Sequence, residues 1–135
     1  MASVPEALLN KVLYVEDDPD IRAIAELALQ DVGGFNAALC SSGQQALRVA
    51  PEFGPDLILL DVMMPEMDGP ETMRRLRVLD ATRSTPVIFM TARIQSSEIE
   101  EYLALGAIGV IPKPFDPMTL ADDIRRIVKE NTQGA

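Results

Sequence analysis

The stretch Asp56-Leu57-Ile58-Leu59-Leu60-Asp61 decides the fold, because a short run of apolar strand formers ends there in a carboxylate. The residues that follow it, 62–69, contain Pro65 and Asp68-Gly69, which is typical of a loop. The carboxyl ends of strands are where open α/β sheets build their sites. Asp61 is therefore the first candidate functional residue.

Three other apolar runs end in side chains that can do chemistry. Residues 11–15 lead into Glu16, Asp17 and Asp18, residues 86–90 lead into Thr91, and residues 107–112 lead into Lys113. If these runs are parallel strands of one sheet, their carboxyl ends lie at one edge. We therefore expect acids, a hydroxyl and an amine to meet there.

Helical patterns separate the strand-like runs. The first begins at Pro19, carries Ile24 and Val32 on its inward face, and ends at Gly33-Gly34. Others are expected at about 44–50, 70–79 and 96–105, and a last helix opens at Asp116-Pro117. With a further strand at 35–40, this is five βα units, which indicates a parallel sheet with helices on both faces. Near-continuous apolar strands fit burial on both sides.

Composition narrows the function. The 135 residues carry a net charge of −9, one cysteine and no histidine. Nucleic-acid binding by this chain needs a basic face, so we expect no direct nucleic-acid contact. No apolar run approaches the ~20 residues that cross a membrane, and no signal peptide is visible. Cys40 is expected as a buried thiol in a reducing compartment, so we predict a cytoplasmic protein.

The ordered motifs of the chain resemble the receiver domain of bacterial two-component response regulators. The resemblance covers about residues 11–129, with a leader expected at 1–10, the domain at 11–130 and a tail at 131–135. It implies a doubly wound, flavodoxin-like (βα)5 fold with strand order 2-1-3-4-5. The matching motifs are Val15-Glu16-Asp17-Asp18-Pro19, Leu60-Asp61-Val62-Met63-Met64-Pro65 with Asp68-Gly69, Met90-Thr91-Ala92, Gly106-Ala107 and Lys113-Pro114-Phe115.

The resemblance assigns roles to the residues at the strand ends. Asp61 is the expected phosphoacceptor. Mg²⁺ prefers oxygen ligands, and Glu16, Asp17, Asp61 and the backbone carbonyl of Met63 are the expected metal ligands. The acid cluster offers three carboxylates for two roles, and alignment on Arg22 selects Glu16 and Asp17, which leaves Asp18 as the lesser candidate. Read without the resemblance, Glu16-Asp17-Asp18 is an acid cluster at a helix N-terminus.

Lys113 and Thr91 are expected to contact the phosphoryl group. The resemblance also predicts a cis Lys113–Pro114 peptide bond. One position departs from the family pattern: Val110 stands where many receivers carry Tyr or Phe, and Val cannot act as a swinging aromatic ring.

We interpret the remaining unusual side chains as structural. Tyr14 is expected in the core, Tyr102 on the surface, and Met63, Met64 and Met67 in loop packing.

The resemblance implies a partner that carries phosphohistidine, either a sensor histidine kinase or a histidine phosphotransfer protein. No output domain follows Val128 in this sequence, so we expect signalling by contact with an unidentified protein, unless the sequence is a piece of a longer chain. The chain would catalyse its own phosphorylation without being a conventional turnover enzyme. The main competing hypothesis is a degenerate receiver that acts only as an interaction module.

A cofactor binder and a phosphohydrolase fit the sequence less well. A flavodoxin-like cofactor binder needs a Ser/Thr/Gly-rich phosphate loop after the first strand, where this chain has acids. A phosphohydrolase of the haloacid-dehalogenase type needs a second Asp two residues after the first, and Met63 stands there.

Overall fold

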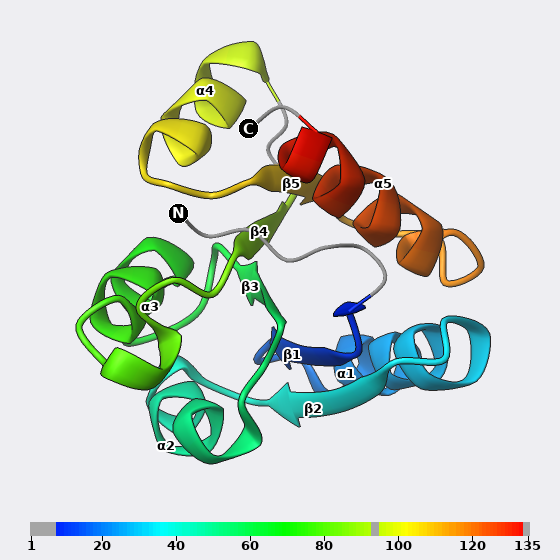
Figure 1. Ribbon diagram of the computed structural model, residues 1–135, viewed down its shortest axis with the longest axis horizontal. Helices are drawn as coiled ribbons and strands as arrows, with labels where there is room; N and C mark the ends of the chain where they lie inside the picture. The colour runs from blue at the N-terminus through cyan, green and yellow to red at the C-terminus, as the bar shows by residue number, and fades with distance from the viewer. Residues whose placement is uncertain (1–7, 93–94, 134–135) are drawn as a thin grey trace.

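Five parallel strands form one sheet in the order β2-β1-β3-β4-β5 (Figure 1). The computed structural model describes residues 8–92 and 95–133. The strand order implied by the family resemblance is confirmed. The strands are β1 (Lys11–Val15), β2 (Asn36–Cys40), β3 (Leu57–Asp61), β4 (Val87–Thr91) and β5 (Gly109–Pro112).

Helices follow the strands and cover both faces of the sheet (Figure 1). One face packs against α1, η2 and α5, through residues such as Ala25, Leu29 and Ile124. The opposite face packs against α2, α3 and α4, through residues such as Ala46 and Met73. The bounds are α1 (Pro19–Glu26), the π-helical turn η2 (Leu27–Val32), α2 (Gly43–Phe53), α3 (Gly69–Leu76), the 3-10 turn η3 (Asp80–Thr82), α4 (Ser96–Ala104) and α5 (Leu120–Gln133).

The central strands are buried on both sides, as their apolar sequences require. Every residue of β3 and β4 is buried, including the polar residues Asp61 and Thr91 that end them. The sheet register places Asp61 beside Met90, and Thr91 beside Pro112. The carboxyl ends of β3, β4 and β5 therefore lie at one edge, as predicted. Cys40 is also buried, and desolvation raises the pKa of its thiol to about 11.

The first helical segment differs from the regular pattern that its sequence predicts. It stops at Gly33, but its last part is π-helical, and the Gly33 N–H binds the carbonyl of Ala28, five residues back. This wider turn rotates the later side chains away from the face that a regular helix would bury. Val32 is exposed for this reason. Ile24 lies before that turn and is also exposed, at the edge of a small groove beside Phe115.

Further helix bounds also differ from those expected. α2 continues through Pro51 to Phe53 and ends at Gly54, which has a left-handed φ of 66°. α3 ends at Leu76, three residues before the expected end. α5 begins only at Leu120, because Asp116 accepts N–H groups within a preceding turn.

Tyr102 corrects a prediction, since it is buried and not on the surface. Its ring packs against Phe89 with the ring centres 5.2 Å apart. Helix α4 thus uses Tyr102 as its main contact with the sheet. Tyr14, expected in the core, is fully buried.

The leader expected at residues 1–10 lies mostly outside the described residues. Of its described part, Leu9 packs on the core and the Asn10 N–H donates to Asp56. Among the helices of the described residues, none combines the length and the apolar content that a bilayer crossing requires.

Candidate functional site

Three carboxylates converge at the carboxyl edge of the sheet. Glu16 and Asp17 follow β1 directly, and Asp61 ends β3, the neighbouring strand. One oxygen from each of the three lies within 4.8 Å of the others, a spacing at which they could share a metal ion. Glu16 and Asp61 are almost fully buried, and Asp17 is exposed. We call Glu16, Asp17, Asp61 and Lys113 the acid pocket.

The remaining acid of the cluster, Asp18, has a different task. It is the N-cap of α1, and its carboxylate accepts the backbone N–H of Asp20 at 2.8 Å and that of Ile21 at 3.4 Å. Capping satisfies N–H groups that a helix start leaves without partners. The structure therefore brings together the pair selected by alignment on Arg22. The Arg22 guanidinium itself donates to the Glu16 carbonyl at 2.8 Å, which fixes the turn between β1 and α1.

Lys113 supplies the positive charge of the acid pocket. Its Nζ lies 2.8 Å from Glu16 Oε1 and 3.1 Å from Asp61 Oδ1, with only 17% of its side chain exposed. Its backbone N–H donates to the carbonyl of Thr91, so the ends of β4 and β5 hold it in place. The Lys113–Pro114 peptide bond is cis, as the resemblance predicts.

The electrostatics of the pocket separate its two buried acids. Burial raises the pKa of Asp61 to about 7, and repulsion by Glu16 adds to this, although Lys113 opposes both. Burial also acts to raise the pKa of Glu16, but hydrogen bonds from Lys113 and the Asp18 N–H outweigh it and hold that pKa below its usual value. The pKa of Lys113 is raised, because its bonds to the two acids outweigh its burial. Without another cation, the pocket disfavours the charge on Asp61.

Tyr14 is a contact of the site that the sequence analysis placed only in the core. Its hydroxyl donates to Glu16 Oε1 at 3.2 Å. Burial is the main cause that raises the pKa of Tyr14, so the phenol stays protonated and acts as a donor. The signal was present in the sequence: Glu16 directly follows β1, and residues two apart along an extended chain point to the same face.

Thr91 ends β4 and Met63 lies in the loop after β3, and their predicted roles stay predictions. Thr91 is buried at the end of β4, next to the strand that ends in Asp61. Met63 lies two residues beyond Asp61 and is 65% exposed. The prediction that it takes part in loop packing is therefore wrong. The other two methionines of the loop do pack, as predicted. Met64 packs against the core on the side of α2 and α3, and Met67 is buried. The ligand role of the Met63 carbonyl stays a prediction.

The loop from β3 to α3 is tightly folded behind Asp61. The Gly69 N–H donates to the Val62 carbonyl, and a Cβ on Gly69 would come within 2.6 Å of the Asp61 carbonyl oxygen. Glycine is thus required for this approach. At Glu66 the chain takes a left-handed φ of 68°, and the Met67 N–H binds the Pro65 carbonyl in a γ-turn. This turn is a strained conformation for a residue with a side chain.

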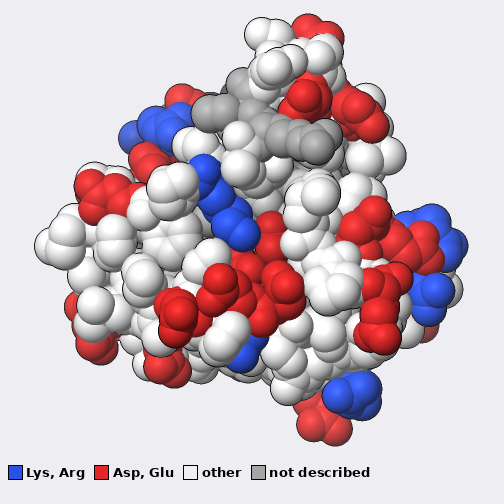
Figure 2. Space-filling model, turned by 180° about the vertical axis from the view of Figure 1, so that it is seen from behind, with Lys and Arg blue, Asp and Glu red and all other residues white. Residues whose placement is uncertain are grey.

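Charge is unevenly distributed over the surface. Figure 2 shows acidic side chains gathered at the centre of one face, with basic side chains next to them. Such a concentration of negative charge favours cations over free anions.

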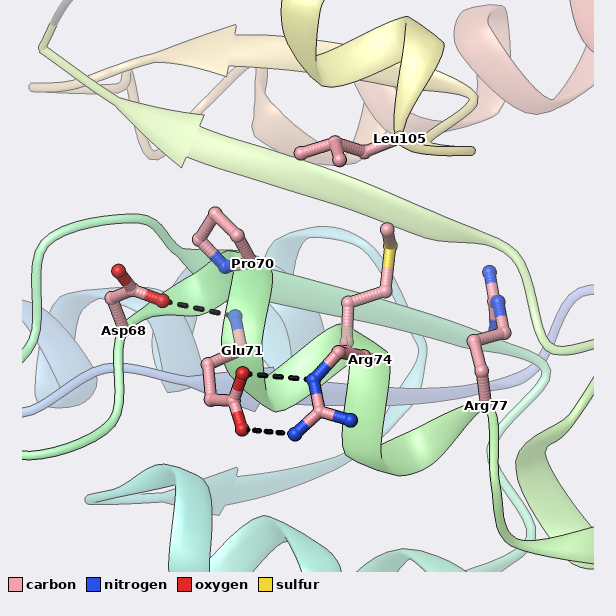
Figure 3. Close-up of a pocket in the computed structure, with 7 residues that line it drawn as sticks. Asp68, Pro70, Glu71, Arg74, Arg77 and Leu105 are labelled. Atoms are coloured by element: carbon pink, nitrogen blue, oxygen red, sulfur yellow. Dashed lines mark hydrogen bonds and ion pairs between the residues drawn. The ribbon is translucent and has the colours of Figure 1, made fainter.

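A separate groove of about 530 Å³ lies between α3 and the end of α4 (Figure 3). It contains none of the acid-pocket residues. Its polar groups are already paired: Arg74 with Glu71, and Arg77 with the carbonyls of Thr82 and Thr85. We assign it no ligand.

Comparison of the sequence with known proteins shows which family the chain belongs to. The family model for the response regulator receiver domain matches residues 12–125. Among curated proteins, the chain is 40% identical over 125 residues to the transcriptional regulatory protein CpxR of Klebsiella pneumoniae, covering 91% of this chain and 51% of that protein. It is 32% identical to the DNA-binding response regulator MtrA of Mycolicibacterium smegmatis, covering 93% and 54%. The chain spans about half the length of the curated relatives it matches.

Solved structures share the fold. The chemotaxis protein CheY4 of Vibrio cholerae superposes with a TM-score of 0.81 at 34% identity, over 88% of this chain and 98% of that one. The receiver domain of the sensor histidine kinase PA1611 of Pseudomonas aeruginosa, described with a magnesium ion coordinated in its active-site cleft, gives a TM-score of 0.76 at 30% identity, over 88% and 97%. The fold is therefore the flavodoxin-like fold of receivers.

Proposed function

Because the chain belongs to the family of response regulator receiver domains, we propose that it accepts a phosphoryl group on Asp61 from a phosphohistidine of a partner protein. One observation carries the proposal: the Asp61 carboxylate lies at the end of β3, between an ammonium 3.1 Å away and two further acids. This is the arrangement that an anionic nucleophile needs when it meets an anionic phosphoryl group.

The acids Glu16, Asp17 and Asp61 fit a divalent cation. They are oxygen donors close enough to share one ion, and among the described residues the two buried acids share a single ammonium, that of Lys113. We infer that Mg²⁺ is the cofactor and that the Met63 carbonyl is a further ligand. When bound, the ion neutralises negative charge on the reacting oxygens. The magnesium reported for the PA1611 receiver domain supports this choice.

The transfer step requires few protein groups. An Asp61 oxygen forms a bond to phosphorus while the bond from phosphorus to the partner's imidazole nitrogen breaks, and that nitrogen keeps the electron pair. Lys113 holds the Asp61 carboxylate before the step and turns its ammonium to a phosphoryl oxygen after it. The Thr91 hydroxyl donates to another phosphoryl oxygen. The chain carries one phosphoryl group at a time, so it acts as a switch and not as a conventional turnover enzyme.

We propose a sensor histidine kinase or a histidine phosphotransfer protein as the partner, since either would supply the phosphohistidine that this sequence, which contains no histidine, cannot provide. We propose that the output is a contact with a target protein. The expectations of a cytoplasmic location and of no direct nucleic-acid contact stay predictions. The second of these is not supported by the relatives, since CpxR is named a transcriptional regulator and MtrA a DNA-binding regulator.

The test is incubation with acetyl phosphate and Mg²⁺, read by intact mass. We expect the addition of one phosphoryl group, which is lost at alkaline pH, and no addition to Asp61→Asn. Asp56→Asn is the matched control, because Asp56 precedes the same strand at its opposite end, where it accepts the N–H groups of Asn10 and Lys11. This variant should be labelled like the wild type. Labelling of Asp61→Asn would contradict the assignment, and absence of labelling in the wild type would favour a degenerate receiver.

A further inference from the structure

Glu16 Oε1 receives two donors of different kinds. Lys113 Nζ lies 2.8 Å away and the Tyr14 hydroxyl 3.2 Å away. The backbone N–H of Asp18 donates to the other oxygen, Oε2, at 3.2 Å. The carboxylate is therefore fixed from three directions, while its residue is almost fully buried.

The two donors to Oε1 differ in what happens to them during signalling. Under the proposed function, Lys113 leaves the acids and turns to the phosphoryl group. Tyr14 cannot move in the same way. It lies inside β1, is fully buried, and its ring meets that of Phe115 edge-on with the ring centres 6.4 Å apart. Its hydroxyl is therefore the donor that stays on the Glu16 side chain in both states.

We propose that Tyr14 is a positioning residue for the cation site: its hydroxyl helps direct the Glu16 carboxylate toward the metal when the ion binds, and holds it there when Lys113 departs. This inference rests on the proposed function and deepens it. Partners of metal ligands commonly act in this way, since a ligand that is held in place needs no reordering when the ion binds. Such positioning matters most for Glu16, because the longer Glu side chain loses more rotamer freedom on ordering than the side chains of Asp17 and Asp61.

Tyr14→Phe is a clean test, because it removes only the hydroxyl and keeps the ring that contacts Phe115. Tyr102→Phe is the matched control. It removes a hydroxyl from the other buried tyrosine, whose ring packs on Phe89 on the opposite face of the sheet. Thermal unfolding of both variants in EDTA shows whether the fold is kept, and we expect midpoints close to that of the wild type.

The primary measurement is a titration with Mg²⁺ alone, followed by NMR shifts of backbone amides. We expect the Kd for Mg²⁺ to rise about threefold to tenfold in Tyr14→Phe and to stay unchanged in Tyr102→Phe. The second measurement is phosphorylation by acetyl phosphate at increasing Mg²⁺. The half-saturating Mg²⁺ concentration should rise by the same factor, while the rate at saturation stays within about twofold. A merely structural role for Tyr14 would not produce this split.

A double-mutant cycle shows whether the hydroxyl acts through Glu16. Tyr14→Phe should have no further effect on the Kd in a Glu16→Ala background, which lacks the oxygen that accepts the hydroxyl. An equal loss in both backgrounds, or a Tyr14→Phe variant that binds Mg²⁺ as tightly as the wild type or more tightly, overturns the role of Tyr14 and leaves the proposed function standing. A wild-type chain that does not bind Mg²⁺ would instead overturn the proposed cofactor and this inference with it.

Discussion

The acid pocket and the outer surface of α3 both contain ion pairs between acids and basic side chains, but the pKa of an acid is raised in the pocket and lowered on the surface. In the pocket, Lys113 lies 2.8 Å from Glu16 and 3.1 Å from Asp61. On the surface, Glu71 lies 2.6 Å from Arg74 (Figure 3) and 2.8 Å from Arg75. Yet the pKa of Asp61 is raised to about 7, chiefly by burial, whereas bonds from Arg74 and Arg75 lower that of Glu71 to about 2.

Distance does not explain this difference, but stoichiometry and burial do. In the part of the pocket that the structure describes, two buried acids share one cation. On the surface, two cations share one acid in contact with water. A buried group without enough counter-charge is costly, and an exposed pair contributes little because solvent screens it. The pocket thus keeps an unsatisfied demand for positive charge, which a metal ion can meet. The surface network has no such demand.

Removal of Lys113, the cation that contacts both buried acids, should have the largest effect. Lys113→Met leaves Glu16 and Asp61 facing one another, and we expect a loss of about 3 kcal/mol in the free energy of unfolding at pH 8 without Mg²⁺. The loss should be smaller at pH 5, because protonation of the acids then relieves their repulsion. Urea unfolding measures both values. Arg75→Met removes a cation from the surface network and should change neither; an equal loss in the two variants would show that burial is not the cause.

Neutralising Asp61, the buried acid with the raised pKa, should change the free energy of unfolding in the opposite direction. The folded pKa of Asp61, about 7, lies above that of an unfolded Asp, about 3.9. Ionisation of Asp61 therefore destabilises the fold increasingly as pH rises from about 4 to about 7, and fully above that range. Without Mg²⁺, Asp61→Asn should stabilise the protein at pH 8 by on the order of 2 kcal/mol, and by little at pH 4.

The same variant provides its own check on the role of metal. Mg²⁺ should stabilise the wild type more than Asp61→Asn, because an ion that binds the native state adds stability that grows with the logarithm of its concentration relative to its Kd, and the loss of a ligand raises that Kd. The gap between the two proteins at pH 8 should therefore narrow as Mg²⁺ is added. If Asp61→Asn were less stable than the wild type at pH 8 in EDTA, attraction to Lys113 would outweigh burial and repulsion at this carboxylate.

The pocket was largely predictable from the sequence because it depends on topology. Asp61, Thr91 and Lys113 each end an apolar run, and parallel strands bring such ends to one edge. The family resemblance supplied the strand order, which no local pattern contains. The contact between Tyr14 and Glu16 was missed, because strand periodicity says which residues share a face but not that a hydroxyl reaches a carboxylate.

The helices were less predictable because neighbouring elements decide their details. A 3.6-residue period placed Val32 inside, but the π-helical turn before Gly33 exposes it. Tyr102 was expected on the surface since the pattern of α4 alone does not reveal Phe89 beneath it. Lastly, the sequence of the β3–α3 loop does not show that Glu66 takes a positive φ.

The β3–α3 loop connects the acid pocket to the surface network on α3. Relief of its strain at Glu66 should have a moderate effect on the free energy of unfolding. Glu66→Gly removes the steric penalty of the left-handed conformation. The greater entropy of glycine in the unfolded chain opposes this gain. We expect a net gain of about 0.5–1 kcal/mol. Thermal unfolding in EDTA measures it. Glu66→Ala is the control: it loses the carboxylate but keeps a Cβ, so it should gain nothing, and an equal gain in both variants would point to charge and not to strain.

The smallest effect should come from the surface network itself. The pKa of Glu71 is lowered, so its ion pairs act above the ordinary pKa of a glutamate and are lost as pH falls toward 2. Both arginines that bind it are at least half exposed, however, and salt screens such pairs. Glu71→Gln should therefore leave the urea midpoint at pH 7 and physiological salt unchanged within error, and any small loss should appear only at low salt. The Asp68 cap of α3 binds the backbone N–H of residue 71, which the substitution keeps. A large loss at physiological salt would mean that the surface network contributes as a buried one does, and the contrast with the acid pocket would then have to rest on stoichiometry alone.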